Sequence, residues 1–154
     1  MTKVLLPKAV IEDIRAHGER WTCGHERGGI ILGFRKADAL QVEAVTFPEI
    51  WDHSSPTLFR RSERGHRVRA LREWMRSQQT CDWLGEWHTH PGGLAAPSFI
   101  DRASWAKLAR HAKKSMTFLI FSDSAMYVGL QSGWLRSVQK LSLVEESRDA
   151  LLFG

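Results

Sequence analysis

The sequence predicts an α/β protein in which a mixed, mostly antiparallel β-sheet is flanked by helices. Three segments carry apolar residues at helical spacing, and between and after them lie short apolar segments of the length typical of strands. The chain has 154 residues, of which 43% are hydrophobic and 25% charged, as in ordinary globular proteins. This length suits one hydrophobic core rather than two. We therefore expect a single domain over residues 1–154.

The first predicted elements are a helix and a hairpin. Residues 7–17 predict a helix, because a proline suits its first turn, apolar residues share one face, and a glycine follows it. Residues 28–34 predict a strand. Alternating apolar and polar residues over 40–44 predict a second strand, which would pair with the first across a short turn. Glu26 would lie at the open end of this hairpin, just before its first strand.

A long loop and a second helix are predicted next. Residues 48–61 contain Pro, Ser, Asp and His without a clear period, which predicts a functional loop that moves. Residues 63–77 predict a helix, because Val68, Leu71 and Met75 form an apolar stripe at helical spacing. We expect this second helix to pack on the sheet.

The second half of the chain predicts a central strand, a third helix and a meander. Residues 82–90 predict the central strand, with Glu86, His88 and His90 on the same face. A helical apolar pattern then runs to residues 113–114, two lysines whose charges suit the C-terminal end of a helix. Three short strands would follow, over residues 116–121, 125–130 and 134–141.

Positive charge is concentrated in one predicted loop and helix. The formal net charge is +5, and the excess is dominated by seven arginines in the segment 60–76. These are Arg60, Arg61, Arg64, Arg67, Arg69, Arg72 and Arg76. They could form a solvated helix face, or they could attract an acidic partner. We do not expect nucleic acid as that partner, because the chain lacks a recognisable nucleic-acid-binding motif.

Composition also bears on the location of the protein and on its cysteines. No apolar run approaches the ~18 residues needed to cross a bilayer, and the first residues turn polar too soon for a secretory signal. We therefore expect a cytoplasmic protein without a membrane span, in which Cys23 and Cys81 are reduced core thiols. Residues 17–19 imitate the His-x-Glu of zinc deaminases, but no Pro-Cys-x-x-Cys follows, which excludes that class.

The most informative segment is Gly85-Glu86-Trp87-His88-Thr89-His90-Pro91, which is followed by Ser98 and Asp101. His88 and His90 are two apart on a predicted strand, so both imidazoles project from one face and could reach one metal ion. Asp101 can supply a third ligand, which leaves a fourth tetrahedral position for water, as in catalytic zinc sites. Ser98 and Asp101 also have the spacing of a helix capping box. The two interpretations are compatible if the N-terminus of a helix delivers Asp101 to the metal.

This pattern resembles the signature of the JAMM (MPN+, or JAB) metalloproteases at every position: His-x-His, ten residues, then Asp, with Ser three before the Asp. The family also places a glutamate far upstream, in a segment reading Glu-x-x-Gly-x-aliphatic-x-Gly, and residues 26–33 fit it. The resemblance implies the MPN fold for the whole chain. It also implies one Zn²⁺ per chain, held by His88, His90 and Asp101.

The resemblance assigns roles to further residues. Glu26 would accept the proton of the attacking water and later donate it to the leaving amine, while Ser98 would stabilise the tetrahedral oxyanion. Glu86 is a rival base because it shares the face of the ligand histidines, although it could instead orient a ligand imidazole. We favour Glu26, which alone has the Glu-x-x-Gly context. Trp87 and Trp105 could line a substrate channel, but tryptophan near a sheet is more often part of the core.

The chain looks most similar to stand-alone bacterial JAB enzymes that reverse ubiquitin-like conjugation, including those that accompany E1-like and E2-like proteins in anti-phage defence. The resemblance implies a zinc-dependent isopeptidase or peptidase that cleaves the amide bond after a ubiquitin-like or related modifier tail. Its partners would be the modifier, the conjugated target protein and E1/E2-like proteins of the same system. Two alternatives are a non-catalytic MPN-type scaffold that binds conjugates and a hydrolase of a small sulfur-carrier precursor. The scaffold ranks behind the enzyme, because inactive relatives usually lose ligands and none is missing here.

Overall fold

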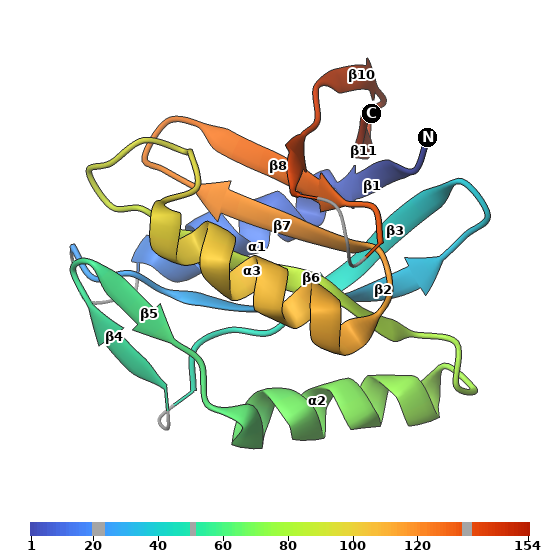
Figure 1. The fold of residues 1–154 in the computed structure, drawn as a ribbon, viewed down its shortest axis with the longest axis horizontal. Coiled ribbons are helices and arrows are strands. Elements are labelled where there is room, and N and C mark those ends of the chain that lie inside the picture. Colours follow the sequence, from blue (N-terminus) through green and yellow to red (C-terminus); the bar gives the residue numbers. More distant parts are fainter. Residues whose placement is uncertain (20–23, 50–51, 134–136) are drawn as a thin grey trace.

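The computed structural model describes residues 1–19, 24–49, 52–133 and 137–154, which form a β-sheet with helices on both faces (Figure 1). The helices are α1 (Lys8–Glu19), α2 (Glu63–Arg76) and α3 (Phe99–Ala112). The strands of the sheet are β1 (Lys3–Pro7), β2 (Gly28–Arg35), β3 (Ala39–Val45), β6 (Asp82–Thr89), β7 (Met116–Phe121), β8 (Met126–Gln131), β9 (Gln139–Lys140), β10 (Leu143–Glu146) and β11 (Ala150–Phe153). A separate hairpin consists of β4 (His53–Ser55) and β5 (Leu58–Arg60).

The described strands of the sheet follow the order β10-β11-β1-β3-β2-β6-β7-β8-β9. Neighbouring strands run antiparallel, except that β1 with β3 and β6 with β7 are parallel pairs. The predicted mixed, mostly antiparallel sheet flanked by helices is therefore confirmed. Strand β6 is hydrogen-bonded to β2 on one side and to β7 on the other, which makes it a central strand of the sheet.

Helices α1 and α3 cover opposite faces of the sheet. Ile14 of α1 is buried in one core with Leu119 of β7, and Trp105 of α3 is buried in another with Phe118. Phe118 and Leu119 are consecutive residues of one strand, so their side chains project to opposite faces. The rings of Trp105 and Phe118 stack with their centroids 4.5 Å apart.

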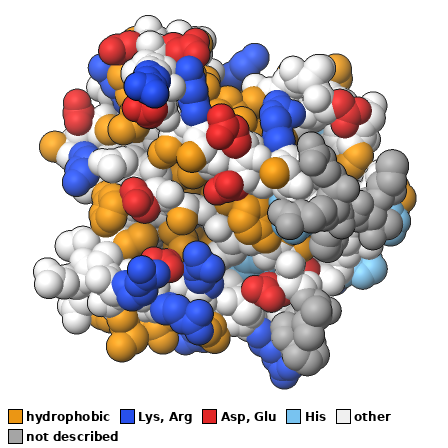
Figure 2. Space-filling view, turned by 180° about the vertical axis from the view of Figure 1, so that it is seen from behind, with side chains coloured by type: hydrophobic (Ala, Val, Ile, Leu, Met, Phe, Trp, Pro, Cys, Tyr) orange, Lys and Arg blue, Asp and Glu red, His pale blue; other side chains and the backbone are white. Residues whose placement is uncertain are grey.

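Helix α2 packs on the sheet through a different face from the one predicted. His66 is fully buried and Ala70 packs against a buried cluster, whereas Val68, Leu71 and Met75 are 57%, 54% and 67% exposed. Helix α2 therefore packs on the sheet as expected, but the apolar stripe that suggested this packing does not make the contact. His66 makes two hydrogen bonds within the protein, and these buried polar contacts fix the rotation of the helix more strongly than its apolar spacing does. Seen from behind, Figure 2 shows basic and hydrophobic side chains next to each other in the lower part of the molecule, where α2 lies in Figure 1.

Several boundaries also differ from the prediction. Pro7 ends strand β1, where it lies opposite Ala150 of β11, instead of opening a helix over residues 7–17. The predicted loop over residues 48–61 contains the β4–β5 hairpin. The strand predicted over residues 134–141 is the short β9, and residues 134–136 lie outside the described part of the chain.

Two expectations from composition can be compared with the described residues. Cys81 is a buried free thiol, as expected, and Cys23 lies outside the described ranges. None of the described helices is both long and apolar enough to span a membrane.

Candidate metal centre

Strand β6 and the turn after it position two histidines in the middle of the molecule. His88 lies opposite Gly28 of β2 and Ile120 of β7, so its backbone is held from both sides. The backbone N–H of His90 donates to the carbonyl oxygen of Phe121 at 2.9 Å, which continues this pairing past the end of β6. As expected for residues two apart on a strand, the two rings lie side by side, with centroids 4.9 Å apart.

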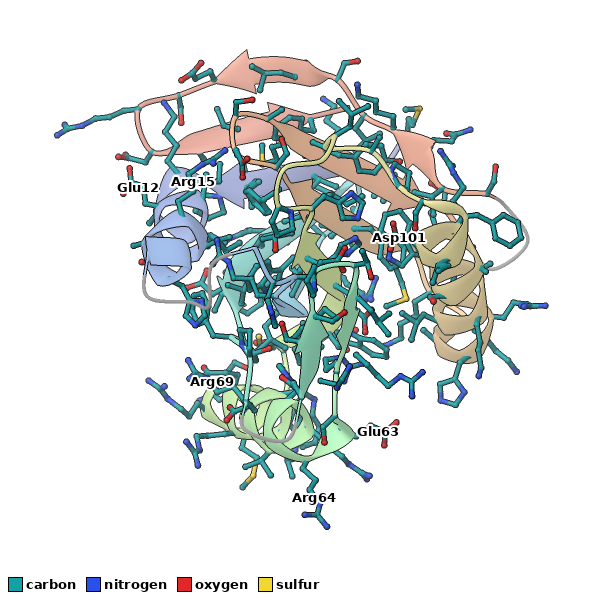
Figure 3. The ribbon with its side chains drawn as sticks, turned by 90° about the vertical axis from the view of Figure 1, so that its left-hand side faces the viewer. Glu12, Arg15, Glu63, Arg64, Arg69 and Asp101 are labelled. Atoms are coloured by element: carbon teal, nitrogen blue, oxygen red, sulfur yellow. The ribbon has the colours of Figure 1, made fainter. Side chains whose placement is uncertain are left out.

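The first turn of α3 brings Asp101 to these histidines. The Ser98 backbone N–H donates to Asp101 Oδ2 at 2.6 Å, and the Asp101 backbone N–H donates to Ser98 Oγ at 3.1 Å. The capping box predicted from the sequence is therefore confirmed. In Figure 3 the Asp101 side chain points from the start of α3 toward the middle of the molecule. The Asp101 carboxylate thus both caps α3 and lies close to the histidines.

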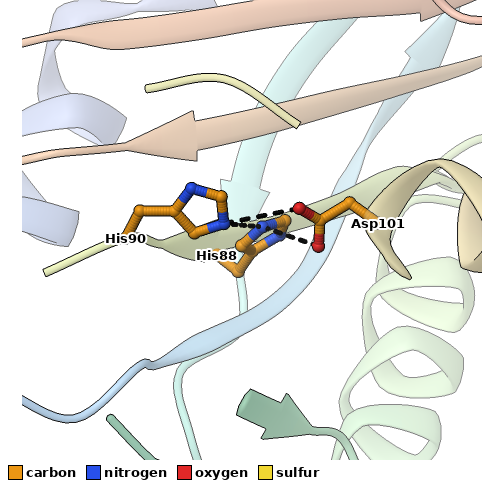
Figure 4. A group of neighbouring side chains, drawn as sticks. All are labelled: His88, His90 and Asp101. Carbon is orange, nitrogen blue, oxygen red and sulfur yellow. Dashed lines mark hydrogen bonds and ion pairs between the residues drawn. The ribbon is translucent and has the colours of Figure 1, made fainter. Parts of the chain in front are cut away.

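The three side chains form a group with the dimensions of a zinc site (Figure 4). His88 Nε2 lies 3.1 Å from His90 Nε2 and 3.2 Å from Asp101 Oδ1, and His90 Nε2 lies 3.4 Å from Asp101 Oδ2. In a tetrahedron with metal–ligand bonds of about 2.0–2.1 Å, neighbouring ligand atoms are roughly 3.3–3.4 Å apart. Two imidazole nitrogens and one carboxylate are also ligand types that zinc prefers. The residues present therefore fit a zinc ion with one position left for water.

A backbone carbonyl supports the orientation of His90. His90 Nδ1 lies 3.0 Å from the carbonyl oxygen of Leu94, in the loop between the histidines and α3. A carbonyl only accepts, so Nδ1 carries the proton, and Nε2 has its lone pair available for a metal ion between it and the other two residues. This supporting contact could not be found in the sequence, because any residue at position 94 supplies the same carbonyl.

The electrostatics of Asp101 favour its ionised form. Burial alone would raise the pKa of Asp101, but the hydrogen bond and charge of His88 and the hydrogen bonds from Ser98 outweigh burial. Together they hold the pKa of Asp101 well below its usual range. An ionised carboxylate is the form that binds a metal cation.

Glu26 lies in the same cleft as the three possible ligands. The cleft has a volume of about 810 Å³, and Glu26, Ser98, His88, His90 and Asp101 are all part of its wall. Burial raises the pKa of Glu26 above its usual value, while the nearby histidines and a hydrogen bond from the backbone of Phe59 oppose that rise. The structure therefore brings together all the site residues predicted from the sequence.

The glycines after Glu26 allow close packing of the strand that begins there. A Cβ atom at Gly29 would overlap the carbonyl oxygen of Thr46, and a Cβ atom at Gly28 would overlap that of Trp87. Side chains at these positions would push β2 away from its neighbours. The Glu-x-x-Gly pattern thus has a packing explanation, because its glycines let the strand that follows Glu26 lie tightly against β6.

Glu86 also lines the cleft, but an arginine binds its carboxylate. Arg61 donates from Nη2 and Nε to Glu86 Oε1, at 2.7 and 3.0 Å, and its guanidinium lies over the ring of Trp83. Glu86 is therefore engaged by Arg61, in place of the predicted alternative contact with a ligand imidazole. Arg61 was one of seven arginines in its segment, and no sequence feature distinguished it from the others.

The two tryptophans considered for a channel are mainly core residues. Trp87 and Trp105 are 1% and 2% exposed, although both contribute atoms to the wall of the cleft. Trp87 donates its indole N–H to the carbonyl oxygen of Thr46, at 2.9 Å. The interpretation as core residues, which we favoured, agrees with this burial.

Solved structures show the same fold. A solution structure of a protein from Desulfitobacterium hafniense has a TM-score of 0.65 and 24% identity, with 91% of each chain covered. A solution structure of a protein from Salinibacter ruber has a TM-score of 0.54 and 17% identity, covering 96% of this chain and 93% of the other.

Sequence comparisons identify the family. Proteins named CD-NTase/cGAS isopeptidase are similar to this chain. The one from Pseudomonas aeruginosa is 36% identical over 128 residues, which cover 82% of this chain and 81% of the relative. Those from Vibrio cholerae and Escherichia coli are 31% and 27% identical, over 75% and 82% of this chain and 73% and 80% of the relatives. The sequence profile described as prokaryotic homologs of the JAB domain matches residues 7–136. The resemblance stated from the His-x-His pattern is thus confirmed, and the chain belongs to the family of prokaryotic JAB-domain homologs.

Proposed function

We propose that this protein is a zinc-dependent isopeptidase that releases a target protein from the C-terminal tail of a modifier. The observation that carries the proposal is the group formed by His88, His90 and Asp101, whose ligand atoms have the spacing of a zinc tetrahedron. The group opens into a cleft that also contains a glutamate with a raised pKa. The isopeptidase names of the similar proteins support the reaction class.

His88, His90 and Asp101 would hold the zinc ion, which when bound would supply a water of lowered pKa and polarise the scissile carbonyl. Glu26 accepts a proton from the attacking water and then donates it to the amine that leaves. Ser98 Oγ accepts a hydrogen bond from the Asp101 N–H, so its own O–H proton is available to donate to the developing oxyanion. Amide hydrolysis then proceeds without a covalent enzyme intermediate.

The substrate we propose is a protein conjugate of a bacterial defence system. The similar proteins are named for CD-NTase and cGAS, which supports a CD-NTase-like protein as the modifier. In an isopeptide bond, the C-terminal carboxyl group of the modifier is joined to a lysine ε-amine of the target. E1-like and E2-like proteins that make such bonds are the expected partners of the same system.

The test combines metal analysis with cleavage of a defined conjugate. The purified protein should carry about one zinc per chain and should cleave a CD-NTase joined through an isopeptide bond to a lysine. His88→Ala and His90→Ala should remove both zinc and activity. His111→Ala is the matched control, because His111 is an exposed histidine of the same cleft outside the ligand group.

Two outcomes would contradict the proposed reaction, and a third would contradict the proposed substrate. Zinc that remains stoichiometric in both ligand variants would place the metal elsewhere. A zinc-loaded protein that binds the conjugate without cleaving it would favour the scaffold. Cleavage confined to a small sulfur-carrier precursor would keep the chemistry and change the substrate.

A further inference from the structure

A buried chain of hydrogen bonds links the sheet to the β4–β5 hairpin. Thr46 Oγ1 lies 2.5 Å from His66 Nδ1, and His66 Nε2 lies 2.7 Å from Asp52 Oδ2. The side chains of His66 and Asp52 are 0% and 1% exposed. Thr46 Oγ1 also accepts the backbone N–H of Ile30 in β2, at 2.9 Å. The chain of bonds therefore begins on the strand that follows Glu26 and ends at the residue before β4.

Asp52 closes the base of the hairpin. Its Oδ1 accepts the backbone N–H of Ser62 at 2.6 Å, and its Oδ2 accepts the backbone N–H of Glu49 at 2.7 Å as well as the bond from His66. Residues 52 and 62 flank the hairpin on either side. One buried carboxylate thus holds the segment that enters the hairpin and the segment that leaves it.

The hairpin in turn contacts Glu26 at three points. The backbone N–H of Glu26 donates to the carbonyl oxygen of Ser55 at 2.8 Å, and Ser54 Oγ donates to the carbonyl oxygen of Glu26. The backbone of Phe59 also lies near the Glu26 carboxylate and lowers its pKa. Glu26 lies outside β2, which begins at Gly28. These contacts therefore fix its position, as strand pairing does for residues within the sheet.

For a neutral His66 ring, the donors and acceptors of the network match in a single arrangement. The Asp52 carboxylate accepts from His66 Nε2–H, so His66 Nδ1 is left to accept the Thr46 hydroxyl proton. Every bond then has one donor and one acceptor. Because the groups are buried, loss of one member leaves its neighbour without a partner, which makes the network sensitive to single substitutions.

We propose that Thr46, His66 and Asp52 are positioning residues that place Glu26 in the cleft by fixing the β4–β5 hairpin. The expected effect on turnover rests on the proposed function. The structural part of the inference, the link from the network to Glu26, can be measured without any activity.

The test uses two isosteric variants, Thr46→Val and Asp52→Asn, and one conservative variant, Thr46→Ser, which keeps the hydroxyl group. Amide hydrogen exchange should accelerate at Glu26 and over residues 53–61 in the first two variants, while the amides of β6 stay protected. Zinc content should remain that of the wild type. Turnover should fall about 10- to 100-fold, with little change in KM, because displacement of a catalytic group by about 1 Å costs rate rather than binding. Thr46→Ser should recover both readouts.

A stability-matched variant separates positioning from simple destabilisation. Val4→Ala truncates a fully buried residue of β1, two strands away from β2. Its melting temperature is measured and compared with that of Thr46→Val. This control should keep wild-type turnover. The proposal is overturned if Val4→Ala loses turnover equally, or if exchange at Glu26 and the hairpin is unchanged in both isosteric variants. An inactive wild-type protein would instead refute the proposed function, and hydrogen exchange would still decide whether the network holds Glu26.

Discussion

His88 and His90 are positioned by the backbone hydrogen bonds of a central strand, whereas Glu26 is positioned by a short hairpin that side chains tie to the core. Asp101 resembles the histidines in this respect, because a local helix cap places it. We call His88, His90 and Asp101 the ligand side of the site and Glu26 the base side. The ligand side depends on contacts close in sequence or on regular sheet pairing. The base side depends on contacts between residues as distant as 26 and 55. The two sides should therefore respond differently to substitution.

The largest effect is expected at the ligand side, from Asp101→Asn. Asparagine keeps an oxygen that can accept the Ser98 N–H, so α3 should still begin at the same residue. The lost negative charge removes a zinc ligand, and a three-ligand site has none to spare. We expect zinc content to fall close to zero and activity to the limit of detection, as measured by metal analysis and a cleavage assay. Full zinc occupancy in this variant would show that Asp101 only caps the helix.

Glu26→Gln should break the base side while leaving the ligand side intact. Zinc should remain bound, because Glu26 is not among the three ligand residues. Turnover should fall by about 10²- to 10⁴-fold, as expected for loss of a general base. The matched variant is Glu86→Gln, which changes a second carboxylate in the cleft, one that Arg61 already binds. If Glu86→Gln lost turnover and Glu26→Gln did not, the base would be Glu86.

Ser98→Ala tests a residue to which we assign two roles. Loss of the cap should destabilise the protein by about 0.5–2 kcal/mol, measured by chemical unfolding. Loss of the hydroxyl donor should lower turnover by about 10²- to 10³-fold. Ser98→Thr keeps both the acceptor and the donor, so it should restore both properties. If the free energy of unfolding fell while turnover stayed at the wild-type value, Ser98 would have the capping role alone.

The smallest effect is expected at Asp82, at the other end of β6 from the histidines. Burial would raise the pKa of Asp82, but hydrogen bonds from Arg35 and Lys114 outweigh burial and lower it. A carboxyl group with a lowered folded-state pKa stabilises the fold above its unfolded-state pKa and loses that contribution as the pH falls through the folded-state value.

Asp82→Asn should therefore cost less than about 1 kcal/mol at pH 7, because the side chains involved are partly exposed. The difference from the wild type should shrink below about pH 4. Zinc content and turnover should not change. A loss of turnover in this variant would mean that the two ends of β6 are coupled, and the contrast between local and distant contacts would need revision.

The same contrast explains which parts of the molecule could be predicted from the sequence. The strand over residues 82–90 and the capping box at Ser98 follow from periodicity and spacing, which are local properties. The orientation of α2 does not, because the buried contacts of His66 fix it and the stripe of Val68, Leu71 and Met75 remains exposed. Pairing of β1 with β11 joins segments almost the whole chain apart, and no local pattern reveals it.

The hairpin and the contacts of the cleft show a similar limit. Residues 53–60 are mostly polar and contain a proline, so their propensity indicates a loop, and their strand pairing depends on the fixed ends at Asp52 and Ser62. Arg61 becomes important only through Glu86, a residue 25 positions away. The grouping of His88, His90 and Asp101 could be predicted, whereas the residues that support Glu26 could not.

The contact between His90 and the carbonyl oxygen of Leu94 has a consequence for what can change at position 94. The group that orients the imidazole belongs to the main chain, so a substitution at position 94 that preserves the turn leaves it in place. The Leu94 side chain itself is 82% exposed. The residue type at position 94 can therefore vary while the orientation of His90 stays constant. Tolerance of substitution and support of the histidine are combined within a single residue.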